Sequence, residues 1–165
     1  MAFDAFLKFD VIDGESTDAK HKGEIEILSY SFGLSNSGSA IADPGTGEGK
    51  VSFQDFHFVS RLQKSSPVLF LKCASGEHIK EAVLSVRKAG GTGLAVDYYK
   101  VKLTDIVVSS FQQGGTGDGQ EAVPLEQISL NFAKFQMQYQ TQNAKGALTG
   151  SPVVAGWDLK ENVKI

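Results

Sequence analysis

The stretch DPGTGEGKV, residues 43–51, has the residue types of a phosphate-binding loop. Such a loop needs the pattern G-x-x-x-x-G-K-[ST], in which backbone N–H groups and the lysine hold the phosphates and the hydroxyl binds Mg²⁺. In this chain the first glycine position is Pro44 and the hydroxyl position is Val51. The residues that follow alternate like a strand, whereas a phosphate site needs a helix N-terminus there. We therefore predict that the segment 38–50 is a glycine-rich connection between two strands and binds no nucleotide.

The other residues that could do chemistry also lack the spacing of a known site. Three histidines are isolated and cannot supply three or four convergent metal ligands: His21, His57 and His78. The acidic stretch 10–18 lacks the spacing of an EF-hand loop. Ser16 and Ser35 lack the closing glycine of a G-x-S-x-G elbow. The sequence predicts no catalytic residue, no metal site and no cofactor. A hydrolase that combines Ser16 or Ser35 with His57 stays open as an alternative.

Two predicted strand faces are polar but carry no charge. One face holds Ser29, Ser31 and Ser35, and the other holds Gln136, Gln138 and Gln140. Ordinary solvent-facing surfaces mix lysine and glutamate among their polar residues. Uncharged faces of this kind fit a surface that meets protein, or one that lines a hydrated channel without binding its contents too tightly.

Composition limits the classes of protein that the chain can belong to. With 165 residues, 41% hydrophobic and 21% charged, the chain fits one globular domain over 1–165. A net charge of −3 gives no electrostatic footprint for nucleic acid or an anionic membrane. The single cysteine, Cys73, excludes an internal disulfide and fits a reducing compartment.

The N-terminal residues do not form the apolar core of a signal peptide. Asp4, Lys8 and Asp10 interrupt the place where an unbroken apolar run would be needed. The longest apolar runs elsewhere are far too short to cross a bilayer. The sequence alone therefore predicts a soluble cytoplasmic protein with no membrane insertion.

Alternation with period two dominates the chain and indicates strands. In four segments the apolar set changes phase, near 27/28, 54/55, 104/105 and 133/134. None of these points has a glycine or proline, which favours one bulged or bent strand over two strands joined by a turn. Bent strands pass from one sheet to another in barrels and orthogonal sandwiches. The pattern predicts a mainly-β fold, a two-sheet β-barrel with bent strands.

One segment has helix signals instead. Ser66 fits an N-cap, Pro67 the first helical position and Gly76 the position just past the end. The spacing predicts one short flanking helix over 67–75, on which Cys73 is a buried apolar residue.

The segment GESTDAKHKGEIEILSYSFGLSNSGS, residues 14–39, resembles the one typical of haemolysin-coregulated proteins, the tube-forming component of type VI secretion systems. The resemblance covers nearly the whole chain in order. It continues through KSSPVLFLKCASGEHI (64–79), LSVRKAGG (84–91), VSSF (108–111), ISLNFAKFQMQY (128–139) and GWDLKENV (156–163). Glu24 departs from it, because many members have an aromatic residue there.

The resemblance implies a barrel with one flanking helix, six copies to a ring, and rings stacked into a tube. It also implies export by the secretion apparatus itself, contacts with its sheath, baseplate and spike proteins, and small effectors held in the lumen. It supplies no catalytic residue. A soluble hydrolase and a monomeric ligand-binding barrel remain the alternatives.

Three groups of residues take roles from this resemblance. Ser29, Ser31 and Ser35 would face the lumen and its effectors, and Gln136, Gln138 and Gln140 would form a neutral interface or a further lumen face. Asp43, Glu48 and Lys50 would contact a neighbouring subunit or the next ring. A closed ring beyond a dimer requires unlike surfaces to meet. Exposed strand edges are pairing templates, and we expect those edges to come from the two terminal regions and from 82–88.

Overall fold

The computed structural model describes residues 3–38, 50–88, 95–120 and 122–165. The described elements, in chain order, are β1 (Phe3–Phe9), β2 (Ile25–Ser31), β3 (Leu34–Asn36), β4 (Val51–Phe53), β5 (Phe56–Arg61), α1 (Ser65–Ser75), β6 (Ile79–Lys88), β7 (Tyr99–Gly114), β8 (Leu125–Gln142), β9 (Leu148–Asp158) and β10 (Val163–Lys164).

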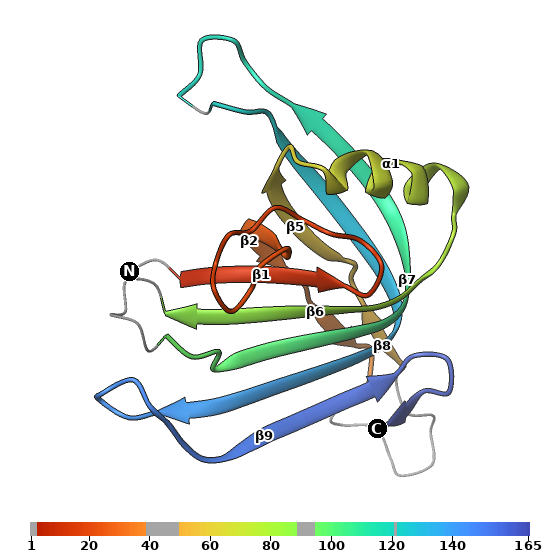
Figure 1. The fold of residues 1–165 in the computed structure, drawn as a ribbon. Coiled ribbons are helices and arrows are strands. Elements are labelled where there is room, and N and C mark those ends of the chain that lie inside the picture. Colours follow the sequence, from red (N-terminus) through yellow and green to blue (C-terminus); the bar gives the residue numbers. More distant parts are fainter. Residues whose placement is uncertain (1–2, 39–49, 89–94, 121) are drawn as a thin grey trace.

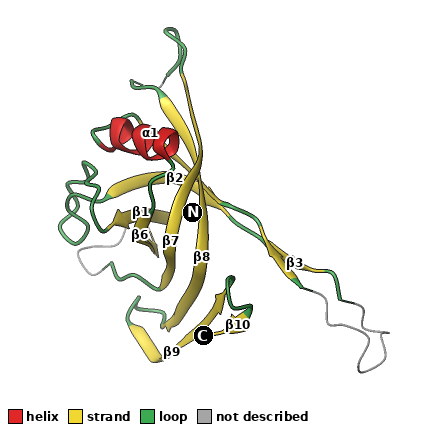
Figure 2. Cartoon of the chain, turned by 90° about the vertical axis from the view of Figure 1, so that its right-hand side faces the viewer, coloured by secondary structure: helices red, strands yellow, loops and turns green. Residues whose placement is uncertain are grey.

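Six antiparallel strands close a barrel in the order β8-β5-β2-β1-β6-β7, and β7 pairs back onto β8 (Figure 1). Strands β9 and β10 extend the wall beyond β8. Strands β3 and β4 form a separate two-stranded arm that projects away from the barrel (Figure 2). The predicted mainly-β barrel with one short helix is confirmed, and its wall is one sheet closed on itself.

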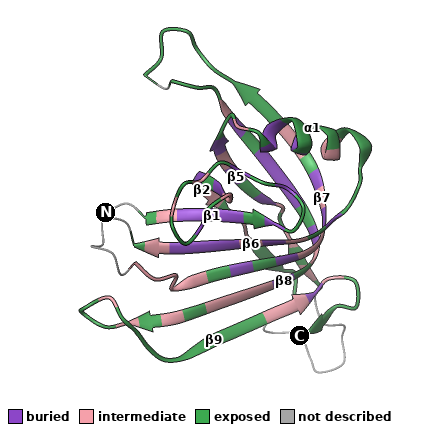
Figure 3. Cartoon of the chain, viewed as in Figure 1, coloured by how far each residue is buried: buried purple, intermediate pink, exposed green. Residues whose placement is uncertain are grey.

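Long strands make this closure possible. The first part of β8 pairs with β5, from Leu125 to Leu130, and its second part pairs with β9, from Lys134 onward. One strand therefore belongs to both halves of the wall. Buried residues follow the inward side of each barrel strand, whereas β9 is exposed along most of its length (Figure 3).

Three of the predicted phase changes are confirmed as continuous strands. In β2 the register against β5 shifts between Ile27 and Ser29, which is a bulge. In β7 the buried set changes from Val101 and Leu103 to Ile106 and Val108. In β8 the buried core residues are even-numbered up to Phe132, and the next buried residue is the odd-numbered Phe135. Each shift by one residue moves all later side chains to the opposite face.

The changes in β7 and β8 lie directly opposite each other. Thr104 pairs with Lys134 and Ile106 pairs with Phe132, so the register is the same on both sides of the kink. Between them Asp105 has φ of 54°, in the left-handed region. Two neighbouring strands therefore bend together at one corner of the barrel, where Asp105 lies in β7.

The prediction of one continuous strand through 54/55 is wrong. The chain forms β4 in the arm and β5 in the barrel, and the Gln54 N–H between them donates to Gly33 O at 2.9 Å. Aromatic rings fix this junction. The Phe53 ring lies 5.8 Å from that of Phe132, and the Phe32 ring lies 4.9 Å from that of Phe135.

The helix prediction is right at its end and wrong at its start. Gly76 has φ of 70° and its N–H donates to Lys72 O at 3.0 Å, as expected of a left-handed C-cap. The helix begins at Ser65, and the N-cap position is Lys64. Ser66 lies inside the first turn, where its hydroxyl donates to Glu126 and accepts the Gln63 N–H. Cys73 is partly buried against the core.

The predicted sheet edges are only partly right. The C-terminal strands β9 and β10 do lie at an edge. However, β1 pairs with β2 and β6, and β6, which contains 82–88, pairs with β1 and β7. These two strands are interior to the closed sheet, so the expectation of free edges there is wrong.

Candidate functional site

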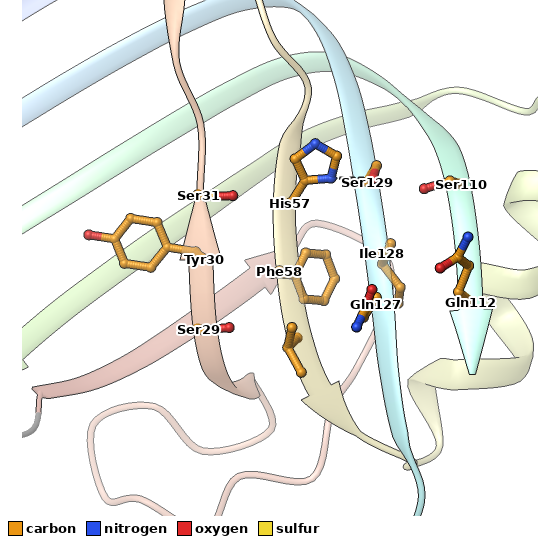
Figure 4. Close-up of a pocket in the computed structure, with 11 residues that line it drawn as sticks. Ser29, Tyr30, Ser31, His57, Phe58, Ser110, Gln112, Gln127, Ile128 and Ser129 are labelled. Carbon is orange, nitrogen blue, oxygen red and sulfur yellow. Dashed lines mark hydrogen bonds between the residues drawn. The ribbon is translucent and has the colours of Figure 1, made fainter. Parts of the chain in front are cut away.

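A shallow cavity of about 370 Å³ lies on the outer side of the wall formed by β2, β5, β8 and β7 (Figure 4). Apart from Tyr30, its polar side chains are hydroxyls, amides and one imidazole, and we call them the serine face: Ser29, Ser31, His57, Ser110, Gln112, Gln127 and Ser129. The residues that line it include no lysine, arginine, aspartate or glutamate. The uncharged character predicted from β2 thus extends over three further strands.

The strand register builds this face in two rows. In one row Ser31 pairs with His57, His57 with Ser129, and Ser129 with Ser110. His57 Nδ1 lies 2.5 Å from Ser129 Oγ within this row. The other row runs from Ser29 through Val59 and Gln127 to Gln112. The backbone groups of these strands are already paired with one another. A partner would therefore contact this wall through its side chains.

A carboxylate, that of Asp55, lies at the margin of the serine face. Asp55 precedes β5 and accepts hydrogen bonds from Ser109 Oγ at 2.6 Å and from Asn131 Nδ2 at 3.0 Å. Polar groups on β7 and β8 therefore stabilise the negative charge of the Asp55 carboxylate. The centre of the face has no lysine, arginine, aspartate or glutamate.

The structure brings two of the three predicted serines together. Ser29 and Ser31 are exposed on β2 and line the cavity. Ser35 lies on β3 of the arm, where it pairs with Ser52. The remaining members of the face were missed by the sequence analysis. The sequence does contain a signal for them, because alternation places each of these side chains on the outward face of its own strand.

The three glutamines lie on a different part of the wall. Gln136 and Gln138 belong to the second half of β8, where their cross-strand neighbours on β7 are Lys102 and Lys100. Gln140 Nε2 donates to Gly150 O at 2.8 Å. These residues line no part of the cavity, so the serine face and the glutamine stripe are separate surfaces.

Of the predicted contact loop, only Lys50 lies within the described residues, and it is exposed directly before β4. Asp43 and Glu48 lie outside them. The strand that follows Lys50 was predicted, and it is the reason why a phosphate loop does not fit this stretch.

The serine and histidine pairing of the hydrolase alternative is absent from the described residues. Ser16 lies between β1 and β2, where its hydroxyl accepts the Asp18 N–H at 3.2 Å, and Ser35 lies on the arm. The serine that contacts His57 is Ser129.

A cluster of charges, which we call the charge clasp, fixes the β1–β2 loop onto the barrel. Arg87 on β6 forms ion pairs with Asp18 of the loop and with Asp4 of β1. The Arg87 guanidinium is the main cause that lowers the pKa of Asp18 to about 2. The guanidinium carbon also lies 5.1 Å from the centre of the Phe6 ring.

His21 is a second part of the charge clasp. Its ring stacks on Phe6 at 4.4 Å, and its two nitrogens lie 2.7 Å from Glu24 and 3.0 Å from Asp97. Glu24, the departure from the family pattern, therefore has a structural contact with a buried histidine.

Two other kinds of site are absent from the described residues. No three histidine, cysteine, aspartate or glutamate side chains within 3–38, 50–88, 95–120 and 122–165 are grouped to hold a metal ion. Within the same ranges no helix has the length and apolar character needed to cross a membrane.

Comparisons with known proteins agree over nearly the full chain. The family described as "Type VI secretion system effector, Hcp" matches residues 6–139. The protein Hcp1 of Pseudomonas aeruginosa is 43% identical over 164 residues, which is 99% of each chain. The crystal structure of Hcp1 from Salmonella typhimurium superposes with a TM-score of 0.82 at 38% identity over all of both chains. The structure of another type six secretion system protein gives a TM-score of 0.89 at 28% identity, over 99% of this chain and 100% of that one.

Proposed function

Because the chain belongs to the Hcp family of type VI secretion tube proteins, we propose that its serine face lines the lumen of the ring and holds small effectors there. Proteins of this family are structural, non-enzymatic components that are secreted by the type VI system and form its hexameric tube. The observation that supports the lumen assignment is the uncharged surface of two cross-strand rows on the barrel wall.

The chemistry of the serine face suits a carrier. Neutral hydroxyl and amide groups form hydrogen bonds that contribute only about 0.5–1.5 kcal/mol each. Six copies around a lumen multiply such weak contacts, so that a cargo is retained without any single tight site. Ser29 and Ser31 are the residues that we assign to effector contact, and His57 and Ser129 extend the same surface. Ser35 lies on the arm. It can therefore contact a cargo only where that arm extends into the lumen of a ring.

The ring contact uses other surfaces. We propose a heterologous contact in which the exposed edge at β9 meets a different part of the next chain. Val153 on β9 is 71% exposed and Val154 is 47% exposed, which gives this edge apolar side chains to bury. Gln136, Gln138 and Gln140 lie beside β9, and we assign these uncharged side chains to the rim of that contact.

The arm is assigned to contacts along the tube. Lys50, together with Asp43 and Glu48, supplies charges that pair with a neighbouring subunit or the next ring. The sheath, the baseplate and the spike proteins of the secretion apparatus are further partners in this proposal. It assigns no residue to those contacts.

The lumen assignment is tested by enlarging the serine face without adding charge. Rings of the double variant Ser29→Gln, Ser31→Gln should form normally, because both side chains are exposed in the single chain. They should retain fewer small secreted proteins than wild-type rings purified from the same secreting cells. Thr17→Gln, an exposed change in the β1–β2 loop, is the matched control. Equal retention by both rings would refute the assignment.

A further inference from the structure

A carboxyl group lies inside the barrel wall at the end where α1 is attached. Glu126 belongs to the inward side of β8 together with Ile128 and Leu130, and its relative exposure is 0%. Its Oε1 accepts hydrogen bonds from Ser60 Oγ at 3.2 Å and from Ser66 Oγ at 2.9 Å. Its Oε2 is buried and has no hydrogen-bond partner among the residues that the structure describes.

This carboxyl joins three elements. Ser60 lies on β5, Ser66 on α1 and Glu126 itself on β8, and the cross-strand neighbour of Glu126 on β7 is Gln113. Beside it the Leu62 N–H donates to Pro124 O at 3.0 Å, which links the start of the helix connection to the base of the β7–β8 hairpin. Figure 1 shows α1 lying against β7 at this end.

Other contacts also hold the start of α1, because the Lys64 N–H donates to Glu15 Oε2 at 2.8 Å and the Gln63 N–H donates to Ser66 Oγ at 3.0 Å. The buried residues of the helix are Ser65, Ser66 and Leu69. Its outer side exposes Val68, Phe70 and Leu71. Leu69 is the one large apolar side chain that the helix buries, and the hydrogen bond between Ser66 and Glu126 attaches its N-terminal turn to the inward side of β8.

The groups that bond to the carboxyl from β5 and α1 are the hydroxyls of Ser60 and Ser66, and its cross-strand neighbour on β7 is the amide Gln113. None of these three side chains carries a charge or titrates in the range concerned. An uncompensated buried charge is costly. Burial accordingly raises the pKa of Glu126, while the hydrogen bonds from Ser66 and Ser60 oppose that rise.

We propose that Glu126 is a proton-controlled anchor, which holds the first turn of α1 and the base of the β7–β8 hairpin while it is protonated and loosens both when its proton is lost to solvent. The direction of movement follows from the packing. An ionised carboxylate needs water, and the barrel side is filled by core residues such as Phe58 and Ile128. Water can reach it by displacement of the α1 turn that covers it.

The pH dependence has a definite sign. Because the folded-state pKa lies above the ordinary value of 4.5, the unfolded chain loses this proton first as the pH rises. The contribution of this group to stability is therefore complete below pH 4.5 and declines until the pH exceeds the folded-state pKa.

Hydrogen–deuterium exchange of the whole chain tests the anchor. In wild type, exchange at 65–69 and 113–126, corrected for its intrinsic pH dependence, should rise as the pH is raised through the ionisation of Glu126. The rise should be about tenfold per pH unit between the ordinary carboxyl pKa and the folded-state pKa of Glu126. Glu126→Gln, which keeps the neutral form, should show no such rise, and Glu26→Gln, exposed on β2, should behave as wild type. An identical pH profile for wild type and Glu126→Gln would overturn the proposal.

A second measurement needs no substitution at Glu126. Infrared difference spectra of wild type should show the C=O stretch of a protonated, buried carboxylic acid that disappears over the same pH range as exchange at α1 increases. The band should shift in Ser66→Ala, which removes one hydrogen-bond donor. Absence of a titrating band while α1 exchange changes with pH would contradict the proposal. These results are independent of cargo retention, so they do not depend on the lumen assignment.

Discussion

At the scale of single residues, the charge clasp shows how a loop without regular structure is held on the barrel. Arg87 reaches Asp18 in the β1–β2 loop and Asp4 on β1, and its side chain is 11% exposed. A partly buried guanidinium with two carboxylate partners has hydrogen bonds stronger than those of a neutral pair. Glu24 contributes to the same loop through His21.

We expect Asp18→Asn to lower the free energy of unfolding by about 1–2 kcal/mol at neutral pH, after allowance for the partial exposure of the pair. The folded-state pKa of Asp18 is lowered to about 2 from 3.8. Its stabilising contribution is therefore present above pH 3.8 and lost as the pH falls toward 2. Urea denaturation of wild type and variant should converge at that acid limit, with the exposed Asp13→Asn as control. A difference that is constant with pH would rule out the ion pair as its cause.

At the scale of elements, the bend in β7 depends on one unusual backbone conformation. Asp105 has a positive φ, which asparagine and aspartate adopt more readily than other residues with a side chain. Its carboxylate also contacts His78 at 2.6 Å and Lys160 at 2.8 Å. The bend thus combines a tolerant residue type with contacts to the start of β6 and to the turn after β9.

We predict that Asp105→Val destabilises the chain by about 1–2 kcal/mol more than Asp105→Asn, because a β-branched side chain resists the left-handed conformation. Both variants lose the same carboxylate, and exposed ion pairs contribute little. Thermal unfolding of the two purified variants measures the difference. Equal melting temperatures would mean that the bend does not need a tolerant residue.

The elements also show how much a sequence of this kind reveals. Alternation predicted the bulge in β2 and the bends in β7 and β8, because a side chain must reverse its face where the register slips. It failed at 54/55, because Phe53 and Phe56 both pack in one aromatic cluster although they belong to different sheets. The expectation of free edges at β1 and β6, made for the ring contact, was wrong because periodicity does not say which strands become neighbours.

The residues of the serine face, like the strands, were predicted only in part. Ser29 and Ser31 were found because they repeat within one strand. His57 and Ser129 were missed because long-range register, which a single strand does not specify, brings them beside Ser31. Glu126 could have been noticed as an acidic residue in the apolar phase of β8, before Ile128 and Leu130.

At the scale of the whole molecule, the exposed edge strand β9 is the surface that differs most from a monomeric barrel. We predict that Val153→Glu leaves the single chain folded, because this side chain is already 71% exposed, but prevents ring formation by burying a charge in the contact. Val11→Glu, at 68% exposure in the β1–β2 loop, is the matched control. Size-exclusion chromatography with circular dichroism separates the two effects. Normal rings from Val153→Glu would exclude β9 from the contact.

The arm gives a second prediction at this scale. We expect replacement of 42–49 by a short turn to leave the barrel folded, since β3 and β4 make a sheet of their own outside it. Ring formation or stacking should weaken, because the removed segment includes two of the three charges assigned to contacts between chains. Negative-stain microscopy of the variant reports this, and unchanged rings and tubes would show that the segment is a surface connection only.

We propose that this chain forms a hexameric ring whose lumen is lined by the serine face. Cryo-electron microscopy of the purified full chain tests both parts in one measurement. We expect six copies of the 17.7 kDa chain around an open lumen, with Ser29, Ser31 and His57 of every copy facing it. A ring in which these residues are buried between chains or face outward, or a chain that remains monomeric, would contradict it.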